Sequence, residues 1–411
     1  MVPINQTDLE KLQSKTVKVL AGGQALGGFG LGATLSVGAI MAVELSGSTA
    51  WSGAAATLST LGSAFSAIPL ANLAYRKGRR IALASGAALA IFGASAMILA
   101  AATRSFPIEL IALFMLGAGS AVSLQARFAA TDLPLTRPKA KDLSLVVWAT
   151  TLGAVIGPNL VAPGEAFGLS IGMPHLAGPF LFTIAAQLGS TLVFWFGLRP
   201  DPLIVARDMA GLSEKRTNPN LKAAIVVIRA FPLAGYAVLT IALSHLVMVS
   251  VMSMTPAHLN ASGHSLADVG LTISLHVGGM YALAPLFGWL SDRFGPRKTI
   301  VLGQLILIAS LAVAGLGQSD FLMVMIGLFL LGVGWSASTV AASALLSQTL
   351  GVEQRSKVQG FSDSLMNFSG AFGGAVSGTI LATYSFSGLN AAALLPVVLI
   401  VFATSFAKRW R

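Results

Sequence analysis

The chain alternates between long apolar stretches and short polar breaks, and the breaks carry most of its charged residues. Cutting the sequence at these breaks leaves twelve apolar stretches of roughly 17 to 25 residues, the length that a helix needs to cross a bilayer. We therefore predict an all-α membrane protein with twelve membrane-spanning helices. They are expected at 18–43, 50–74, 81–102, 107–127, 143–163, 177–198, 231–255, 269–290, 299–316, 321–346, 360–383 and 389–407.

The basic residues predict the orientation of these spans. If the N-terminus is cytoplasmic, 25 of the 26 Lys and Arg residues fall on the cytoplasmic side, and only Arg104 falls outside. An excess of positive charge in cytoplasmic loops is the usual signal of membrane topology. A missed helix would turn half of the basic loops outward, so the charge pattern also supports twelve spans. Both termini are expected in the cytoplasm.

Composition excludes several classes of function. The net charge of +11 follows from topology, because the basic residues lie in short loops without the stacking aromatics of a nucleic-acid site. With no cysteine, neither a disulfide nor a thiolate ligand is available. Residues 1–17 are polar and no cleavable signal peptide is expected. No paired acids, nucleophile triad or phosphate loop indicates an enzyme, and no cofactor is expected.

The outer loops are acidic. A negative surface would concentrate cations at an outer entrance, although loops that merely lack the basic bias would look the same. The acids that fall at or near this face are Glu44, Glu109, Glu165, Asp268 and Asp320.

The chain contains an internal repeat of about 217 residues. Three glycine pairs share this spacing: Gly78 with Gly295, Gly153 with Gly370, and Gly157 with Gly374. Such a repeat predicts two pseudo-symmetric six-helix bundles that rock around a central site. The expected divisions are 1–198 for the first bundle, 199–222 for a cytoplasmic linker and 223–411 for the second bundle.

Two pairs of soft-ligand side chains lie in the seventh and eighth predicted spans. Met248 and Met252 are four residues apart, as are His276 and Met280, so each pair shares one helical face. At 1.5 Å per residue, the two pairs lie about 6–12 Å and about 12–18 Å below the outer surface. Thioether sulfur with imidazole, and without thiolate or carboxylate, favours copper as a transported ion.

The same region holds further candidates. A methionine in a membrane helix usually fills space, whereas a histidine there usually faces a cavity or a partner. Because the four ligands are neutral, a bound cation could be released inward along the membrane potential, which favours import. Weaker candidate ligands are His245, Met254, His258 and His264, and possible proton or cavity residues are Gln24, Gln125 and Asp363. Asp363 could instead lie at a cytoplasmic helix end, where the helix dipole favours an acid.

The loop after the eighth span reads Gly288-Trp-Leu-Ser-Asp292-Arg293-Phe-Gly295-Pro-Arg297-Lys298. It resembles the signature loop of the major facilitator superfamily, which implies that fold and a gating role for Gly288, Asp292, Arg293, Gly295 and Arg297. In that family the aspartate locks to a neighbouring helix terminus in one access state. The first-half copy has Tyr75 in place of the aspartate, which implies a weaker or differently built lock.

Span five resembles the antiporter motif of the same superfamily, through Gly153-Ala-Val-Ile-Gly157-Pro158. Close helix packing at small residues explains this pattern equally well. Many drug:proton exporters of the superfamily carry a buried arginine in span four, and here Leu113 occupies that position. The exporter hypothesis is therefore disfavoured.

The Met-x-x-x-Met and His-x-x-x-Met pairs resemble those of the CcoA-type copper importers, a group that also includes riboflavin importers. The resemblance implies a bacterial inner-membrane protein that imports copper for assembly of cbb3-type cytochrome c oxidase. It also implies Met248, Met252, His276 and Met280 as copper ligands and cytoplasmic copper-handling proteins as partners. A monomer in membrane lipid is expected. The alternatives are an importer of a small organic solute such as riboflavin, which would need stacking aromatics, and a drug:proton antiporter.

Overall fold

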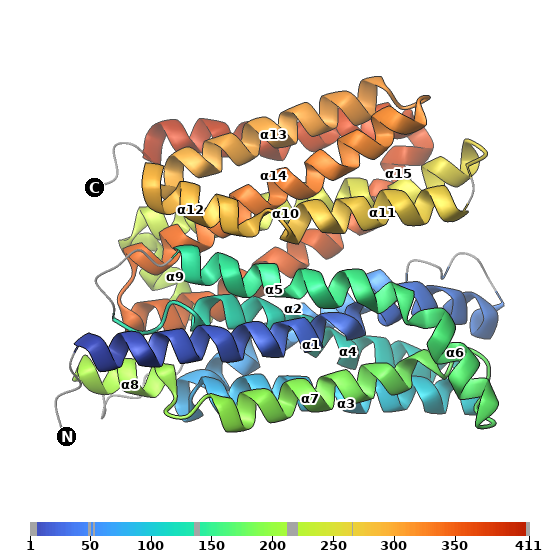
Figure 1. Ribbon diagram of the computed structural model, residues 1–411. Coiled ribbons are helices and arrows are strands. Elements are labelled where there is room, and N and C mark those ends of the chain that lie inside the picture. Colours follow the sequence, from blue (N-terminus) through green and yellow to red (C-terminus); the bar gives the residue numbers. More distant parts are fainter. Residues whose placement is uncertain are drawn as a thin grey trace. The chain divides into compact units, whose positions relative to one another are not determined.

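A computed structural model describes residues 6–47, 51, 54–134, 140–211, 221–264 and 266–407 (Figure 1). Within these ranges the chain forms α-helices and no strands, which confirms the predicted fold class. The helices of the first part are α1 (Gln6–Ser46), α2 (Ala54–Lys77), α3 (Arg79–Thr103), α4 (Phe106–Ala129), α5 (Ala140–Asn159), α6 (Val161–Ser170), α7 (Pro179–Gly197) and α8 (Pro202–Met209). The remaining helices are α9 (Leu221–Ala230), α10 (Pro232–Ala261), α11 (Leu266–Tyr281), α12 (Ala284–Phe294), α13 (Pro296–Leu316), α14 (Phe321–Thr349) and α15 (Val352–Ala407).

Where the structure describes them, the predicted spans fall on one helix or on two consecutive helices. Eight helical stretches within the described residues are long and apolar enough to cross a membrane, and the last of them, Val352–Ser405, is long enough for two crossings. Ser385 divides that stretch, because its backbone has a φ of 63° and breaks the helix between the eleventh and twelfth predicted spans. The eighth predicted span is shared by α11 and α12, and α12 begins at Ala284 with Pro285 in its first turn.

The structure divides into two compact units. Unit 1 comprises Met1–Pro138, Leu145–Ala224 and Val352–Ser364. Its helices cross closely where glycines remove a side chain: a Cβ on Gly117 of α4 would overlap the backbone of α2. The apolar clusters of this unit include one around Leu20, Leu83 and Phe194 and one around Met41, Met97 and Phe180.

Unit 2 comprises Lys139–Ser144, Ile225–Gly351 and Leu365–Arg411. Its centre is α14, which packs against α10, α11 and α13. Nearly all of α14 from Leu331 to Ser347 is buried, although this stretch includes several hydroxyl side chains. Gln304 of α13 satisfies part of this polarity, since its amide donates hydrogen bonds to Ser244 Oγ at 3.1 Å and Ser338 Oγ at 2.8 Å.

Two helices begin in one unit and continue in the other. The first residues of α5 belong to unit 2, while the rest of that helix belongs to unit 1. Conversely, α15 begins in unit 1 and joins unit 2 from Leu365 onward. The polar residues that hold these two helix starts are therefore candidates for a functional role.

Candidate functional site

The predicted soft ligands all lie in unit 2, around α14. Met248 and Met280 are buried in one apolar cluster with Trp335, and Met252 packs against that cluster while partly buried. The two ligand-bearing helices each pack mainly on α14 and have little direct contact with one another. The four side chains are thus gathered in the interior of one helical unit.

His276 faces α14 and is completely buried. Its Nδ1 lies 2.8 Å from the carbonyl oxygen of Leu328, and its Nε2 has no hydrogen-bond partner within the described residues. Gly332 lets α14 approach this closely, because a Cβ there would overlap the carbonyl oxygen of His276. The described part of the chain contains no group of three or more His, Cys, Asp or Glu residues able to hold a metal. A metal in unit 2 would depend on methionine sulfur.

The outer histidines have structural partners. His258 Nε2 lies 2.7 Å from the carbonyl oxygen of Gln318, and its ring stacks on Phe386 with centroids 4.2 Å apart. His264 lies against Phe321, with ring centroids 4.9 Å apart. Met254 packs against the apolar cluster of unit 2. These contacts hold helix ends and loops together.

An aromatic cluster that the sequence pattern did not reveal joins three helices of unit 2. The indole N–H of Trp335 (α14) donates to His245 Nδ1 (α10) at 3.2 Å, with ring centroids 6.0 Å apart. The ring of Tyr281 (α11) meets Trp335 edge to face at 6.0 Å. His245 and Tyr281 are only partly buried. Gly370 of α15 makes room for His245, since a Cβ there would lie 2.9 Å from His245 Nε2.

The surface of α11 is open at Gly278. Gly278 precedes Tyr281 by three residues on the same face of α11, and a Cβ on Gly278 would meet no atom within 4 Å. Ser274, one turn earlier, is exposed. Leu271, on the same stripe of α11, is exposed as well. This face of α11 therefore combines two small residues with an exposed leucine and the ring of Tyr281.

The signature loop holds the start of α5. Asp292 accepts hydrogen bonds from the backbone N–H groups of Ala140 at 3.1 Å and Lys141 at 2.9 Å, so its carboxylate caps this helix. Gly288 lies directly against the same turn, because a Cβ there would overlap Ser144. These contacts place the predicted aspartate at a helix terminus.

The other residues of the signature loop shape the turn. Gly295 has a φ of 94°, a conformation that glycine adopts without strain. The guanidinium of Arg293 lies 5.6 Å from the ring centroid of Trp289, and Arg297 is partly buried. The loop therefore presents Asp292 from a fixed turn.

The first-half copy uses a different set of residues. Tyr75, which stands where the superfamily has an aspartate, accepts a hydrogen bond at its carbonyl oxygen from Arg207 Nη1 at 2.6 Å. Asp201 accepts a hydrogen bond from the backbone N–H of Arg80 at 2.8 Å and also caps α8. Arg207 and Asp201 therefore hold this first-half turn.

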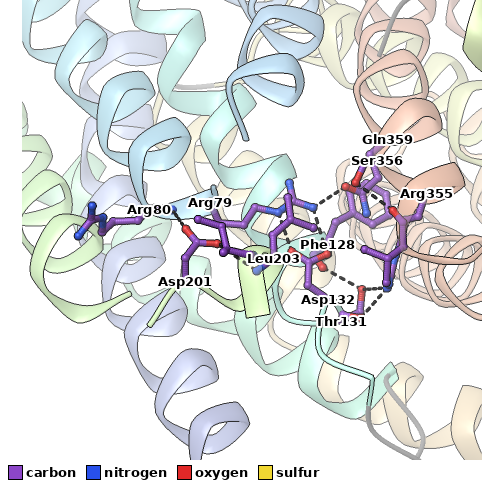
Figure 2. A network of polar contacts seen from close by, with 12 residues as sticks. Arg79, Arg80, Phe128, Thr131, Asp132, Asp201, Leu203, Arg355, Ser356 and Gln359 are labelled. Carbon is purple, nitrogen blue, oxygen red and sulfur yellow. Dashed lines mark hydrogen bonds and ion pairs between the residues drawn. The ribbon is translucent and has the colours of Figure 1, made fainter. Parts of the chain in front are cut away.

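A buried polar network joins α3, the end of α4 and the start of α15 (Figure 2). Arg79 donates to both carboxylate oxygens of Asp132, at 2.7 and 3.2 Å, and its Nη2 donates to Gln359 Oε1 at 2.5 Å. Arg355 donates to the carbonyl oxygen of Thr131. Arg79, Asp132 and Arg355 are each at most 2% exposed. The network fixes the first turns of α15 to α3 and α4.

Asp363 takes part in the same junction. Arg127 Nη2 lies 2.6 Å from Asp363 Oδ1, and both side chains are buried. The candidate proton residue is thus held in an ion pair. The glutamines also join helices: Gln24 donates to the carbonyl oxygen of Ser123 at 3.0 Å and Gln125 donates to that of Ala67 at 3.0 Å.

The eight long apolar helical stretches of the described residues are those of a multi-pass membrane protein. Residues 237–411 match the family model described as Major Facilitator Superfamily. Over 402 residues the chain is 37% identical to the uncharacterized MFS-type transporter YddS of Bacillus subtilis (strain 168). The alignment covers 95% of this chain and 92% of that protein. The chain belongs to the major facilitator superfamily, whose members are transporters and not enzymes.

Two further similarities extend over nearly the whole chain. It is 28% identical over 401 residues to the riboflavin transporter RfnT of Brucella anthropi, covering 94% of this chain and 95% of that protein. A crystal structure of a bacterial homologue of the iron transporter ferroportin, in the outward-facing state, superposes with a TM-score of 0.72 at 17% identity, covering 96% of this chain and 99% of the other. The second likeness concerns the fold alone.

Proposed function

We propose that this chain imports a small planar organic solute of the riboflavin class across the bacterial cytoplasmic membrane by alternating access. The observation that carries the proposal is the cluster of His245, Trp335 and Tyr281 beside the open face of α11. The similarity to a riboflavin transporter over nearly the full length supports the same class of solute.

The chemistry of the cluster suits a flat heteroaromatic ring. Aromatic side chains bind such rings by offset or edge contacts, and tyrosine and tryptophan add a polar edge. Because the Trp335 N–H is already bonded to His245, the indole ring is held in place before a solute arrives. Tyr281 and the small residues Ser274 and Gly278 would then form the side that the solute contacts.

We further propose that the two capped helix starts act as gates. Asp292 holds the start of α5 and the Arg79–Asp132 pair holds the start of α15, each next to a glycine-bounded turn. Breaking either contact would free the first turns of its helix.

The test is uptake of tritiated riboflavin by cells or proteoliposomes that contain the chain. Tyr281→Leu should raise KM roughly 2- to 10-fold, since an aromatic contact is worth about 0.5–1.5 kcal/mol. Phe372→Leu is the matched control, because Phe372 is an aromatic residue of the same unit that is 63% exposed. Riboflavin uptake no higher than in vesicles without the protein would contradict the proposal.

Copper import for cytochrome oxidase assembly is the second candidate. It is favoured by the buried His276 Nε2, which has no hydrogen-bond partner among the described residues, in a unit that also buries Met248 and Met280. Met248→Leu and Met280→Leu remove the sulfur at nearly constant volume. If copper is the substrate, both should reduce radioactive copper uptake, while Met97→Leu, at an equally buried methionine of α3, should not. Equal uptake in all variants would remove copper from consideration.

Drug:proton export has less support. Leu113, at the position where many exporters carry arginine, is completely buried in the apolar cluster of unit 1 with Met41, Met97 and Phe180. This apolar environment does not suit a charged side chain of the kind that drug:proton exporters carry at this position.

A further inference from the structure

The end of α7 carries two exposed aromatic rings. Trp195 and Phe196 directly precede Gly197, the last residue of that helix, and they are 40% and 61% exposed. In the expected topology this is the cytoplasmic end of the sixth predicted span. Tryptophan is enriched where a membrane meets water, because its ring is apolar while its indole N–H is polar. Both rings therefore lie at the level of the lipid headgroups.

A guanidinium group lies beside each ring. The guanidinium carbon of Arg199 is 5.6 Å from the ring centroid of Phe196, and that of Arg80 is 5.2 Å from the ring centroid of Trp195. Arg80 follows Arg79 in α3, but its side chain points away from the buried network that holds Arg79 (Figure 2). A cation within about 6 Å of an aromatic ring is attracted to the face of that ring. Both rings are thus held next to positive charge.

Two lysines of α1 add to this charge. Lys15 Nζ donates a hydrogen bond to the carbonyl oxygen of Arg199 at 2.5 Å. Lys18 follows one turn later on the same side of α1, and both lysines are exposed. Gly197 lets α1 come this close to α7, because a Cβ there would lie 2.7 Å from Val19 Cγ1. Three cationic side chains from two segments therefore gather at the end of α7.

The neighbouring acid is engaged elsewhere. Asp201, two residues after Arg199, accepts hydrogen bonds from backbone N–H groups at the starts of α3 and α8. In the described part of the chain, the side chains of Lys15, Lys18 and Arg199 form no ion pair with an acid. The cluster therefore keeps a net positive charge beside its exposed rings.

The headgroup of a phospholipid matches this chemistry. Phosphate oxygens accept strong, charge-assisted hydrogen bonds from guanidinium and ammonium groups. Basic pockets between membrane helices on the cytoplasmic side bind anionic headgroups. Basic residues alone are common on that side of a membrane protein, but here they surround exposed rings at one helix end. A free phosphate ion would meet the cations and leave both rings without a partner, so the combination favours a lipid.

We propose that this cluster binds an anionic phospholipid of the cytoplasmic leaflet. Its members are Lys15, Lys18, Trp195, Phe196 and Arg199. The headgroup phosphate lies among the three cations, and the two rings lie along the glycerol and the first carbons of an acyl chain. A lipid bound there joins α1 to the end of α7 and stabilises unit 1. The proposal does not depend on which solute the protein transports.

Native mass spectrometry of the purified protein tests the site, with phosphatidylglycerol as the anionic probe. The wild type should bind phosphatidylglycerol at lower concentrations than zwitterionic phosphatidylcholine. The double variant Lys15→Gln with Arg199→Gln should bind phosphatidylglycerol more weakly, by roughly 5-fold for each charge removed. Arg104→Gln, which removes an exposed charge after the opposite end of α3, is the matched control and should bind like the wild type. No loss in the double variant, or an equal loss in Arg104→Gln, would overturn the assignment.

Further variants separate the parts of the site. Lys15→Arg with Arg199→Lys keeps both charges and should bind phosphatidylglycerol like the wild type. Trp195→Leu should weaken that binding roughly 2- to 10-fold. Phe92→Leu, at a 65% exposed ring in the middle of α3, should not weaken it. Loss of binding in the charge-preserving variant, or an equal loss in the two ring variants, would contradict the proposed contacts.

Thermal unfolding in detergent tests the stabilising role of the lipid. Phosphatidylglycerol should raise the unfolding midpoint of the wild type, because a ligand of the folded state stabilises that state. The midpoint of the double variant Lys15→Gln with Arg199→Gln should respond much less. Glycerol 3-phosphate supplies the same phosphate without acyl chains and should raise neither midpoint. An equal rise in wild type and double variant, or a full effect of glycerol 3-phosphate, would refute a specific lipid site.

Discussion

Arg127 of α4 and Asp363 of α15 form a buried ion pair, with Nη2 and Oδ1 2.6 Å apart and side chains 3% and 0% exposed. Both residues lie in unit 1, although α15 continues into unit 2. The pair therefore joins the end of one span to the beginning of another that is more than two hundred residues away in the chain.

Removing one member of this pair should destabilise the protein strongly. Asp363→Asn leaves the Arg127 charge buried without compensation, which costs about 3–5 kcal/mol. The double variant Arg127→Met with Asp363→Leu should recover most of that loss, because no charge remains to be desolvated. Thermal unfolding of the single and double variants in detergent measures the difference. Losses that simply add would show that the two groups do not interact.

The Arg79–Asp132 pair should require arginine and not only positive charge. Arg79→Lys cannot make the two parallel hydrogen bonds to Asp132, and its loss should cost about 1.5–3 kcal/mol. Arg80→Lys is the control, because its backbone N–H makes the bond to Asp201 and survives the change. Unfolding midpoints and riboflavin uptake should both fall for Arg79→Lys and stay near wild type for Arg80→Lys. Equal effects at the two positions would refute a specific requirement for the two hydrogen bonds from the Arg79 guanidinium to Asp132.

Asp292→Asn should loosen the start of α5. The amide keeps one acceptor but loses the negative charge that favours a helix N-terminus, a change of about 1 kcal/mol. Because the chain has no cysteine, Ser144→Cys supplies a single buried thiol on that helix. A thiol reagent should label Cys at this position faster when Asp292→Asn is also present. Asp320→Asn, the same change at the N-cap residue of α14, should leave the labelling rate unchanged.

Gly332 and Gly278 should respond oppositely to alanine. At Gly332 the added methyl would lie 2.9 Å from the backbone N of Met280, so α11 and α14 must separate at a cost of about 1–3 kcal/mol. At Gly278 the methyl meets no atom, and the higher helix propensity of alanine should leave stability equal or better. If the solute lies over α11, Gly278→Ala should nevertheless raise the KM for riboflavin. An unchanged KM would place the solute elsewhere.

Riboflavin should stabilise the purified protein, whereas Cu(I) should not. A ligand at 100 times its Kd adds about 2.7 kcal/mol to the stability of the folded state. The unfolding midpoint should therefore rise with riboflavin concentration and be unaffected by a copper chelator. A rise with Cu(I) that disappears in Met248→Leu and Met280→Leu would reverse the ranking of the two proposed substrates.

The hydrophobic pattern was sufficient to predict the membrane spans, because the length of an apolar stretch is a local property of the sequence. Within the described residues the predicted stretches are helical, and the differences lie at helix ends and at breaks within a stretch. The first helix begins at Gln6 and not at 18, since polar residues can extend a helix beyond the membrane. Pro285 and Ser385 set breaks whose geometry depends on the backbone and not on hydropathy.

The site was less predictable because its contacts are not local. Spacing of four residues showed that His276 and Met280 share a face, but it could not show that this face meets α14. The Arg79–Gln359 bond joins residues 280 positions apart, and Trp335 pairs with His245 across 90 positions. A single tryptophan among small residues in α14 was the one local signal that could have suggested the aromatic cluster.

The start of α5 belongs to unit 2 and the start of α15 belongs to unit 1, which has a consequence if the chain is cut in two. A polypeptide cut in the segment 212–220 would give an N-terminal fragment whose α5 begins with residues of unit 2, and a C-terminal fragment that carries Val352–Ser364 of unit 1. Each fragment would therefore lack a piece that completes it and carry a piece that completes the other. Two such fragments, made together in one membrane, should assemble into an active transporter, whereas either fragment alone should be degraded.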